Sequence, residues 1–200
     1  FTAHSPTVTL DKAGAAKRVE SVLSSQGVAW QSHWKLLMSM QQSPSMLTTF
    51  LWEKGVNPDA FRHYTQAPYW RIRIVDTNEH NQVQDLYALR LGPNGELIRF
   101  KCMAPPESFS STPHADLIKQ TIQDFGYDSK HPFGVAKRAT KLKNNTQYYQ
   151  YVLDHTEQPH PFQRASLVLN VANNYIVDAF QMLKLPKDWV YKTKANQSIR

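Results

Sequence analysis

The chain has 200 residues, of which 41% are hydrophobic and 12% aromatic, and its formal net charge is +7. A chain of this size and aromatic content can bury enough apolar surface to offset the entropy of ordering it, which excludes an intrinsically disordered protein. The positive charge is scattered, and its densest group is Lys137, Arg138, Lys141 and Lys143. Because nucleic-acid-binding proteins gather such charge on one face, we predict no nucleic-acid partner, whereas an anionic membrane surface nearby is compatible with the charge.

No apolar run reaches the length that spans a bilayer, so we expect no membrane-crossing segment within these residues. The chain begins at Phe1 and shows no signal-peptide pattern, so we expect it to be a processed or excised piece of a longer protein. The single cysteine, Cys102, allows neither an internal disulfide nor a CxxC metal site. It lies in an apolar stretch, which favours a buried and unreactive thiol.

The first predicted helix lies near the N-terminus. Ala16, Val19 and Leu23 form an apolar stripe at helical spacing, and Gly27 is a typical residue for a helix end. A strand is expected to follow at residues 28–38.

A helical insert is predicted between this strand and the next, at residues 43–66. Met46 and Phe50 predict a short helix, and Gly55 would end it. The Asn-Pro pair that ends at Pro58 predicts the start of another helical turn.

Residues 69–76 alternate as a strand with one buried face. Ile72 and Ile74 lie on the apolar side, and Arg71 and Arg73 lie on the other. We expect the two arginines to face solvent or another part of the chain. A second interpretation is that they grip an acidic peptide or a carboxylate.

A hairpin pattern occurs twice. The segment "YALRLGPNGELIRFKCMAPPESF" (87–109) falls without a gap on "LVLNVANNYIVDAFQMLKLPKDW" (167–189), which aligns Phe100 with Phe180. Each copy has two strands joined by a tight turn and then a proline that ends the pairing. The aromatic residue three positions after that proline, Phe109 or Trp189, is expected to fold back and plug the end of the sheet.

Upstream of the second hairpin the same order of elements is predicted. Thr112 would cap a helix with Pro113 at its first position, and the helix would end at Gly126. Strands are predicted at residues 133–142 and 148–155. The fold class is therefore α+β, with two tandem helix-plus-antiparallel-sheet repeats at residues 1–110 and 111–200, of which the first carries the insert.

The amino-acid sequence of several segments resembles a known family. The segments "FLWEKGVNP", "HYTQAPYWRIRIVD", "ALRLGPNGELIRFKCMAPPE" and "MLKLPKDWVYK" are similar to the PepSY and cystatin-like extracytoplasmic modules. They are most similar to a region ahead of the transmembrane part of bacterial CAAX-processing-type intramembrane proteases and related membrane proteins. The similarity extends from about Leu10 to Tyr191. It implies a tandem accessory region and no catalytic residue, because the metalloprotease motifs of that family are absent.

Sites of other kinds are weakly indicated. His155 and His160, beside two acidic residues, could form a loop metal site, but two prolines favour a plain connection between strands. Serines lack a nucleophile elbow, no carboxylate pair marks an acid–base couple, and glycines do not cluster into a phosphate loop. We therefore predict no catalytic residue, no metal and no cofactor, and the sequence assigns no ligand-binding residue.

The predicted function is a non-enzymatic extracytoplasmic sensor or ligand- or peptide-binding domain of a bacterial membrane or envelope protein. Recognition would use an exposed sheet edge or groove. The expected location is the periplasmic or envelope face, near the membrane surface and tethered to it. The expected partners are a transmembrane or catalytic region of the same protein and a peptide or small molecule. Two alternatives are a secreted protease inhibitor or processing chaperone of cystatin-like fold, and an enzyme with a dispersed site.

Overall fold

The computed structural model describes residues 8–42, 46–56, 64, 68–77, 82–104, 114–128, 133–134, 137–143, 146–156, 164–172 and 174–197. Its elements in chain order are α1 (Lys12–Ser25), β1 (Lys35–Gln41), α2 (Met46–Glu53), β2 (Tyr69–Thr77), β3 (Val83–Leu91), β4 (Leu97–Cys102), α3 (His114–Asp124), β5 (Lys137–Lys143), β6 (Thr146–Asp154), β7 (Arg164–Ala172), β8 (Tyr175–Lys184) and α4 (Lys187–Gln197). The predicted α+β class with antiparallel strands is confirmed.

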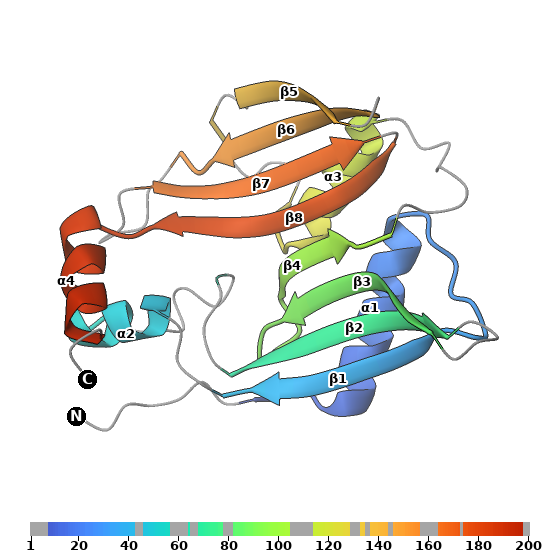
Figure 1. The fold of residues 1–200 in the computed structure, drawn as a ribbon, viewed down its shortest axis with the longest axis horizontal. Coiled ribbons are helices and arrows are strands. Elements are labelled where there is room, and N and C mark those ends of the chain that lie inside the picture. The colour runs from blue at the N-terminus through green and yellow to red at the C-terminus, as the bar shows by residue number, and fades with distance from the viewer. Residues whose placement is uncertain are drawn as a thin grey trace.

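The eight strands among the described residues form one sheet in the order β1-β2-β3-β4-β8-β7-β6-β5. Each half contributes a helix followed by four strands, and the two sets of strands meet in mirrored order at β4 and β8 (Figure 1). Helices α1 and α3 lie side by side against one face of the sheet, while α2 and α4 lie together beyond the strand ends (Figure 1). We call the face turned away from α1 and α3 the open face.

Helix α1 forms where the sequence predicts it. The Asp11 side chain accepts a hydrogen bond from the Gly14 backbone N–H at 2.7 Å and so caps the first turn. Gly27, at φ 73°, ends the helix in the left-handed conformation that glycine tolerates. The apolar stripe differs by one position, because Ala15 is fully buried while Ala16 is half-buried. The predicted cap of α3 at Thr112 and Pro113 lies outside the described residues.

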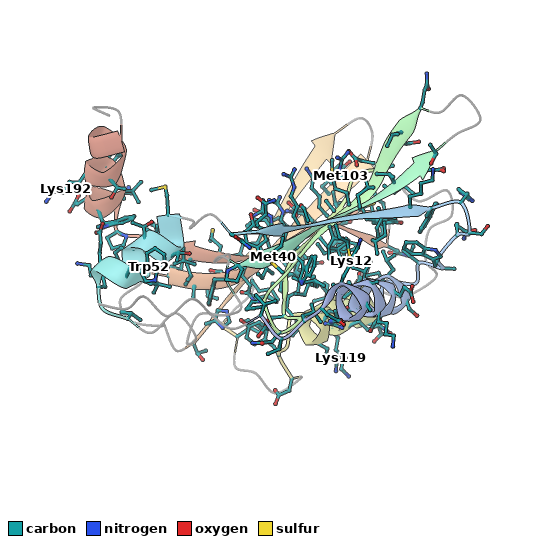
Figure 2. The ribbon with its side chains drawn as sticks, turned by 90° about the horizontal axis from the view of Figure 1, so that it is seen from below. Lys12, Met40, Trp52, Met103, Lys119 and Lys192 are labelled. Atoms are coloured by element: carbon teal, nitrogen blue, oxygen red, sulfur yellow. The ribbon has the colours of Figure 1, made fainter. Side chains whose placement is uncertain are left out.

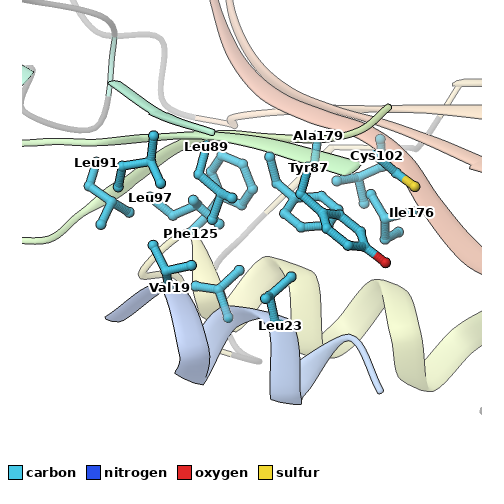
Figure 3. Packing of buried hydrophobic residues seen from close by; sticks show 14 of the residues in the cluster. Val19, Leu23, Tyr87, Leu89, Leu91, Leu97, Cys102, Phe125, Ile176 and Ala179 are labelled. Carbon is cyan, nitrogen blue, oxygen red and sulfur yellow. The ribbon is translucent and has the colours of Figure 1, made fainter. Parts of the chain in front are cut away.

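The main core lies between the sheet and these two helices (Figure 3). Val19 and Leu23 from α1 and Phe125, just after α3, pack toward the sheet. They meet Leu89 from the first half and Ala179 from the second. Burial of this kind is the main source of stability in a domain of this size, and here both halves share it.

The register of the hairpins corrects the gapless alignment of the two copies. Leu89 pairs with Phe100 in the β3–β4 hairpin, whereas Leu169 pairs with Ala179, not with Phe180, in the β7–β8 hairpin. The reason is that the second turn is one residue shorter. Since a one-residue shift reverses the face of a strand residue, Phe100 lies in the core and Phe180 lies on the open face.

Both hairpins nevertheless share two details. The β3–β4 ladder has a register shift between Arg90 and Leu91, and the β7–β8 ladder has one between Asn170 and Val171. Both turns also contain a residue at positive φ, Gly95 and Asn174, as the turn chemistry predicts.

The strand predicted at residues 28–38 is shorter and later than expected. Pairing begins only at Lys35, and Trp34 instead packs against Tyr87 with ring centroids 5.9 Å apart. The strand predicted at 133–142 likewise begins at Lys137, and Phe133 makes an isolated bridge with His155. Aromatic residues with high strand propensity are used here for packing outside the ladder.

A second apolar cluster lies where α2 meets α4. Phe50 of α2 is fully buried and packs edge-on against Trp189 of α4, with ring centroids 4.9 Å apart. The insert helix is thus as predicted, with Gly55 at φ 64° just after it, while the predicted turn at Pro58 lies outside the described residues. Trp189 does not plug the sheet as expected, because a helix that the sequence reading missed follows Pro186. Phe109 lies outside the described residues.

A polar clamp joins α1 to α3 on the other side of the core. Asp124 accepts a hydrogen bond from the Ser25 hydroxyl and another, at 3.3 Å, from the Gln26 amide. Arg18 donates to the Asp124 carbonyl oxygen at 2.7 Å, and its guanidinium lies 3.7 Å from the carboxylate. Burial nevertheless outweighs these partners and raises the pKa of Asp124.

We expect Phe50→Ala to lower the free energy of unfolding by about 3–5 kcal/mol, because it leaves a cavity in a fully buried site. Trp52→Ala, on the exposed side of the same helix, is the control and should cost less than about 1 kcal/mol. Urea unfolding followed by circular dichroism measures both. Equal losses for the two variants would contradict an α2 helix that is anchored through Phe50.

Asp124 should also leave a mark on the pH dependence of stability. Because its pKa is raised in the folded chain, the folded state holds this proton more tightly than the unfolded state, so stability falls as pH rises through the folded pKa. In Asp124→Asn this component is absent. The difference in unfolding free energy, wild type minus variant, should therefore decrease between pH 4 and pH 7, and parallel pH profiles would contradict the assignment.

Candidate functional site on the open face

The open face of the first half carries a pocket of about 290 Å³ over strands β2, β3 and β4. Its charged lining consists of Arg71, Arg73, Asp85, Arg90, Arg99 and Lys101. Figure 2 shows the arrangement from the side, with Lys119 on the helix side of the sheet and Met103, which also lines the pocket, on the other. Five basic side chains against one carboxylate make this pocket strongly positive.

Three of the arginines form a row across the sheet. Arg71 of β2 pairs in register with Arg90 of β3, and Arg90 pairs with Arg99 of β4. Like charges placed directly opposite each other on neighbouring strands destabilise a sheet. An anion held over the row would relieve that repulsion, so the row is the chemical feature of greatest interest in the described chain. We refer to these three residues as the arginine row.

Part of the positive charge is already balanced. Arg99 makes a bidentate pair with Asp178 of β8 at 3.0 and 2.7 Å. Arg73 makes the same kind of pair with Asp85, with both bonds at 2.8 Å. Such pairs fix the direction of a guanidinium as well as its charge. Arg73, Asp85 and Arg99 all line the pocket.

The rest of the charge is available to a ligand. Arg90 stacks over the Tyr69 ring at 5.5 Å, which orients it without neutralising it. Arg71 is exposed, and neither the Arg71 side chain nor the Lys101 side chain has a hydrogen-bond or ion-pair partner among the residues that the structure describes. Arginine groups held in this way are suited to carboxylates and phosphates.

The second half shows that the fold itself does not require this charge. At the same register positions of β6, β7 and β8 lie Gln150, Asn170 and Asp178. The amide of Gln150 donates to the Asn170 side-chain oxygen at 3.0 Å, and the carboxylate of Asp178 pairs with Arg99 of the first half. The arginine row therefore represents a property of the first half alone.

The sequence located part of this site. Arg71 and Arg73 lie on the face opposite the core, as the alternation of β2 predicts, and the structure brings both to the pocket. Arg90, Arg99 and Lys101 were missed. Their signal was present in the strand alternation, but only the pairing of three strands shows that the charges meet.

Of the two histidines that were considered as metal ligands, only His155 lies among the described residues. His155 is buried between the rings of Tyr127 and Phe133, each 5.1 Å away, and His160 lies outside the described residues. Within the part of the chain that is described, no three His, Cys, Asp or Glu side chains gather as metal ligands would. His155 thus belongs to an aromatic cluster.

Cys102 lies on the core side of β4. Burial raises the pKa of its thiol to about 11, and the thiol donates to the Ala104 carbonyl oxygen at 2.9 Å. Burial also raises the pKa of the neighbouring Tyr87 to about 12. Both groups stay protonated at neutral pH, which suits packing and does not suit nucleophilic chemistry.

Comparisons with known proteins were made at three levels. No family model, no curated protein sequence and no solved structure gave a significant match to the chain. Among the described residues, no helix has both the length and the apolar character needed to cross a bilayer.

Cys102 provides a direct test of the packing beneath the pocket. With its pKa near 11, the thiol should react with Ellman's reagent at pH 8 about a hundredfold more slowly in the folded chain than in guanidinium chloride. The same sample after unfolding is the control. Equal rates in the two states would show that β4 does not bury its thiol.

Proposed function

We propose that this chain is a non-enzymatic binding domain whose open face takes a carboxylate-bearing ligand, in particular an acidic segment of a peptide. The arginine row carries the proposal. Arg71 and Arg90, which face each other in register, repel one another because neither has an acidic partner among the described residues, whereas Arg99 is paired with Asp178. A bound anion removes that repulsion while gaining charge-assisted hydrogen bonds. The row would thus favour anions over neutral ligands of similar shape.

The size of the pocket supports a small anionic group. About 290 Å³ is at the lower limit for small-molecule sites and is too small to enclose a dinucleotide or another large cofactor. A glutamate or aspartate side chain, or the terminal carboxylate of a small molecule, fits this space. The remainder of a larger ligand would then lie along the open face.

We further propose that the two halves arose from one duplicated module of the PepSY and cystatin-like kind. The repeated order of one helix and four strands supports this, as do the matching register shifts in the β3–β4 and β7–β8 hairpins. With that origin, the domain would act as a sensor at the extracytoplasmic face of a bacterial membrane or envelope. Its partner there would be a transmembrane or catalytic region of the same protein.

Binding of hexaglutamate, measured by isothermal titration calorimetry in 20 mM salt, tests the proposed function. Wild type should bind, and Arg71→Ser combined with Lys101→Ser should bind at least about tenfold more weakly, a loss of ~1.4 kcal/mol or more. Binding should also weaken as salt is added. Both substituted side chains lack a described partner, so their loss should leave the fold intact.

The control is Lys17→Ser combined with Lys119→Ser, which removes the same charge from exposed positions of α1 and α3. If this control weakened binding as much as the pocket variant, only net charge would be involved and the site would be wrong. Equal affinity for a single-stranded oligonucleotide would contradict a carboxylate-specific site. No binding of hexaglutamate at low salt would contradict the proposal itself.

A further inference from the structure

The two edges of the sheet differ in a way that points to the form of the ligand. Strand β5 forms one edge, and four of its seven residues are basic, which is a common protection against pairing with other strands. Strand β1 forms the other edge with the sequence KLLMSMQ and a single charge. By this criterion β5 is a guarded edge and β1 is an open one.

Among the described residues, none pairs with the outer side of β1. It pairs with β2 on one side, and no residue from Lys35 to Gln41 makes a further backbone hydrogen bond to any described residue. Unpaired N–H and C=O groups along such an edge are a template for an added strand. Leu37, on the open-face side of β1, is 46% exposed, which leaves apolar surface for that strand to cover.

The side chains of β1 specify what an added strand would carry. Leu36, Met38 and Met40 alternate toward the helix side and are only half-buried, and the first two pack at the rim of the main core. Apolar residues at alternate positions of an added strand would complete this rim. The positions between them would lie over the open face.

The arginine row determines the chemistry of one of those positions. Ser39 of β1 pairs in register with Arg71, so an added residue opposite Ser39 would lie in line with the row, two strands beyond Arg71. Two strand spacings, about 10 Å, separate that residue from β2, and extended glutamate and arginine side chains together cover this distance. The small serine leaves the path between them open, and Arg71 has no described partner.

We propose that the ligand is an extended acidic peptide that adds to the sheet as a strand beside β1, with a glutamate or aspartate opposite Ser39 and apolar residues opposite Met38 and Met40. This inference rests on the proposed anion-binding function of the open face and assigns the form and position of its ligand. The main chain of the peptide binds the edge, and its carboxylate selects the register.

The probe is a capped, fluorescent peptide of sequence Thr-Thr-Val-Glu-Val-Thr-Thr, which presents the same pattern in either direction. Fluorescence anisotropy should show that it binds. Its Glu→Gln analogue should bind wild type at least tenfold more weakly, but should bind Arg71→Ser about as well as the Glu peptide does. With the control variant Lys119→Ser, the Glu→Gln change in the peptide should weaken binding as much as it does with wild type.

Backbone methylation separates strand addition from attraction by charge. In an antiparallel or parallel ladder alternate N–H groups face the neighbouring strand. Of two analogues, one N-methylated at Glu and the other at both Val residues, one should lose at least tenfold in affinity and the other should retain it. Hydrogen exchange of residues 36–41 should slow in the complex while that of residues 137–143 does not change.

Three results would overturn the inference. If both methylated analogues bound like the parent while hexaglutamate still bound, the ligand would be held by charge alone, and the proposed function would stand without strand addition. If sedimentation velocity showed that the chain is a dimer and the two copies met at β1, the natural partner of this edge would be a second copy. If neither the peptide nor hexaglutamate bound, the proposed function and this inference would both fail.

Discussion

The pairing of β4 with β8 is the constraint on which the rest of the structure depends. It consists of three residue pairs at the centre of the sheet, of which Phe100 with Ala179 points into the core. The bidentate pair between Arg99 and Asp178 lies on the open face of the same junction. Because this short ladder joins two sets of four strands, the core on one face and the open face on the other are each continuous across both halves.

A junction of three pairs needs support from elsewhere, and it has support on two sides. On the helix side, the clamp around Asp124 ties α1 to α3. At the strand ends, Tyr64, from the segment between α2 and β2, is buried and hydrogen-bonded to Tyr127 of the second half, which also accepts from Gln181 at 2.8 Å. The insert of the first half therefore acts as a brace against the second half.

Much of the fold could be predicted from local signals. Glycines ended α1 and α3, turn residues placed both hairpins, and alternation gave the inward face of β2. What could not be predicted depends on the exact register of paired strands and on packing between distant elements. A one-residue difference in turn length places Phe180 on the open face, although it aligns with Phe100 in the sequence. Helix α4 forms because Trp189 can pack on Phe50.

The site illustrates the same limit. The polar face of a single strand predicts that Arg71 and Arg73 avoid the core, but a charge on one strand acquires chemical meaning only from its neighbours across the ladder. Arg90 and Arg99 became part of a site through register, which depends on turn length and strand pairing and cannot be seen in one strand alone. The equivalent row of the second half, built from Gln150, Asn170 and Asp178, shows that the same geometry can carry uncharged side chains and one acidic group that is paired with Arg99.

The braced junction also bears on how a ligand could bind. Arg99 and Arg73 are held by bidentate pairs, and Arg90 is held by its stack on Tyr69, so these groups lose little further freedom when an anion arrives. Arg71, which is exposed and lies nearest to β1, is the member of the row that would have to be ordered. Affinity would then depend on that one side chain and on the β1 edge beside it. The other basic groups of the pocket supply a positive electrostatic field that is already in place before the anion binds.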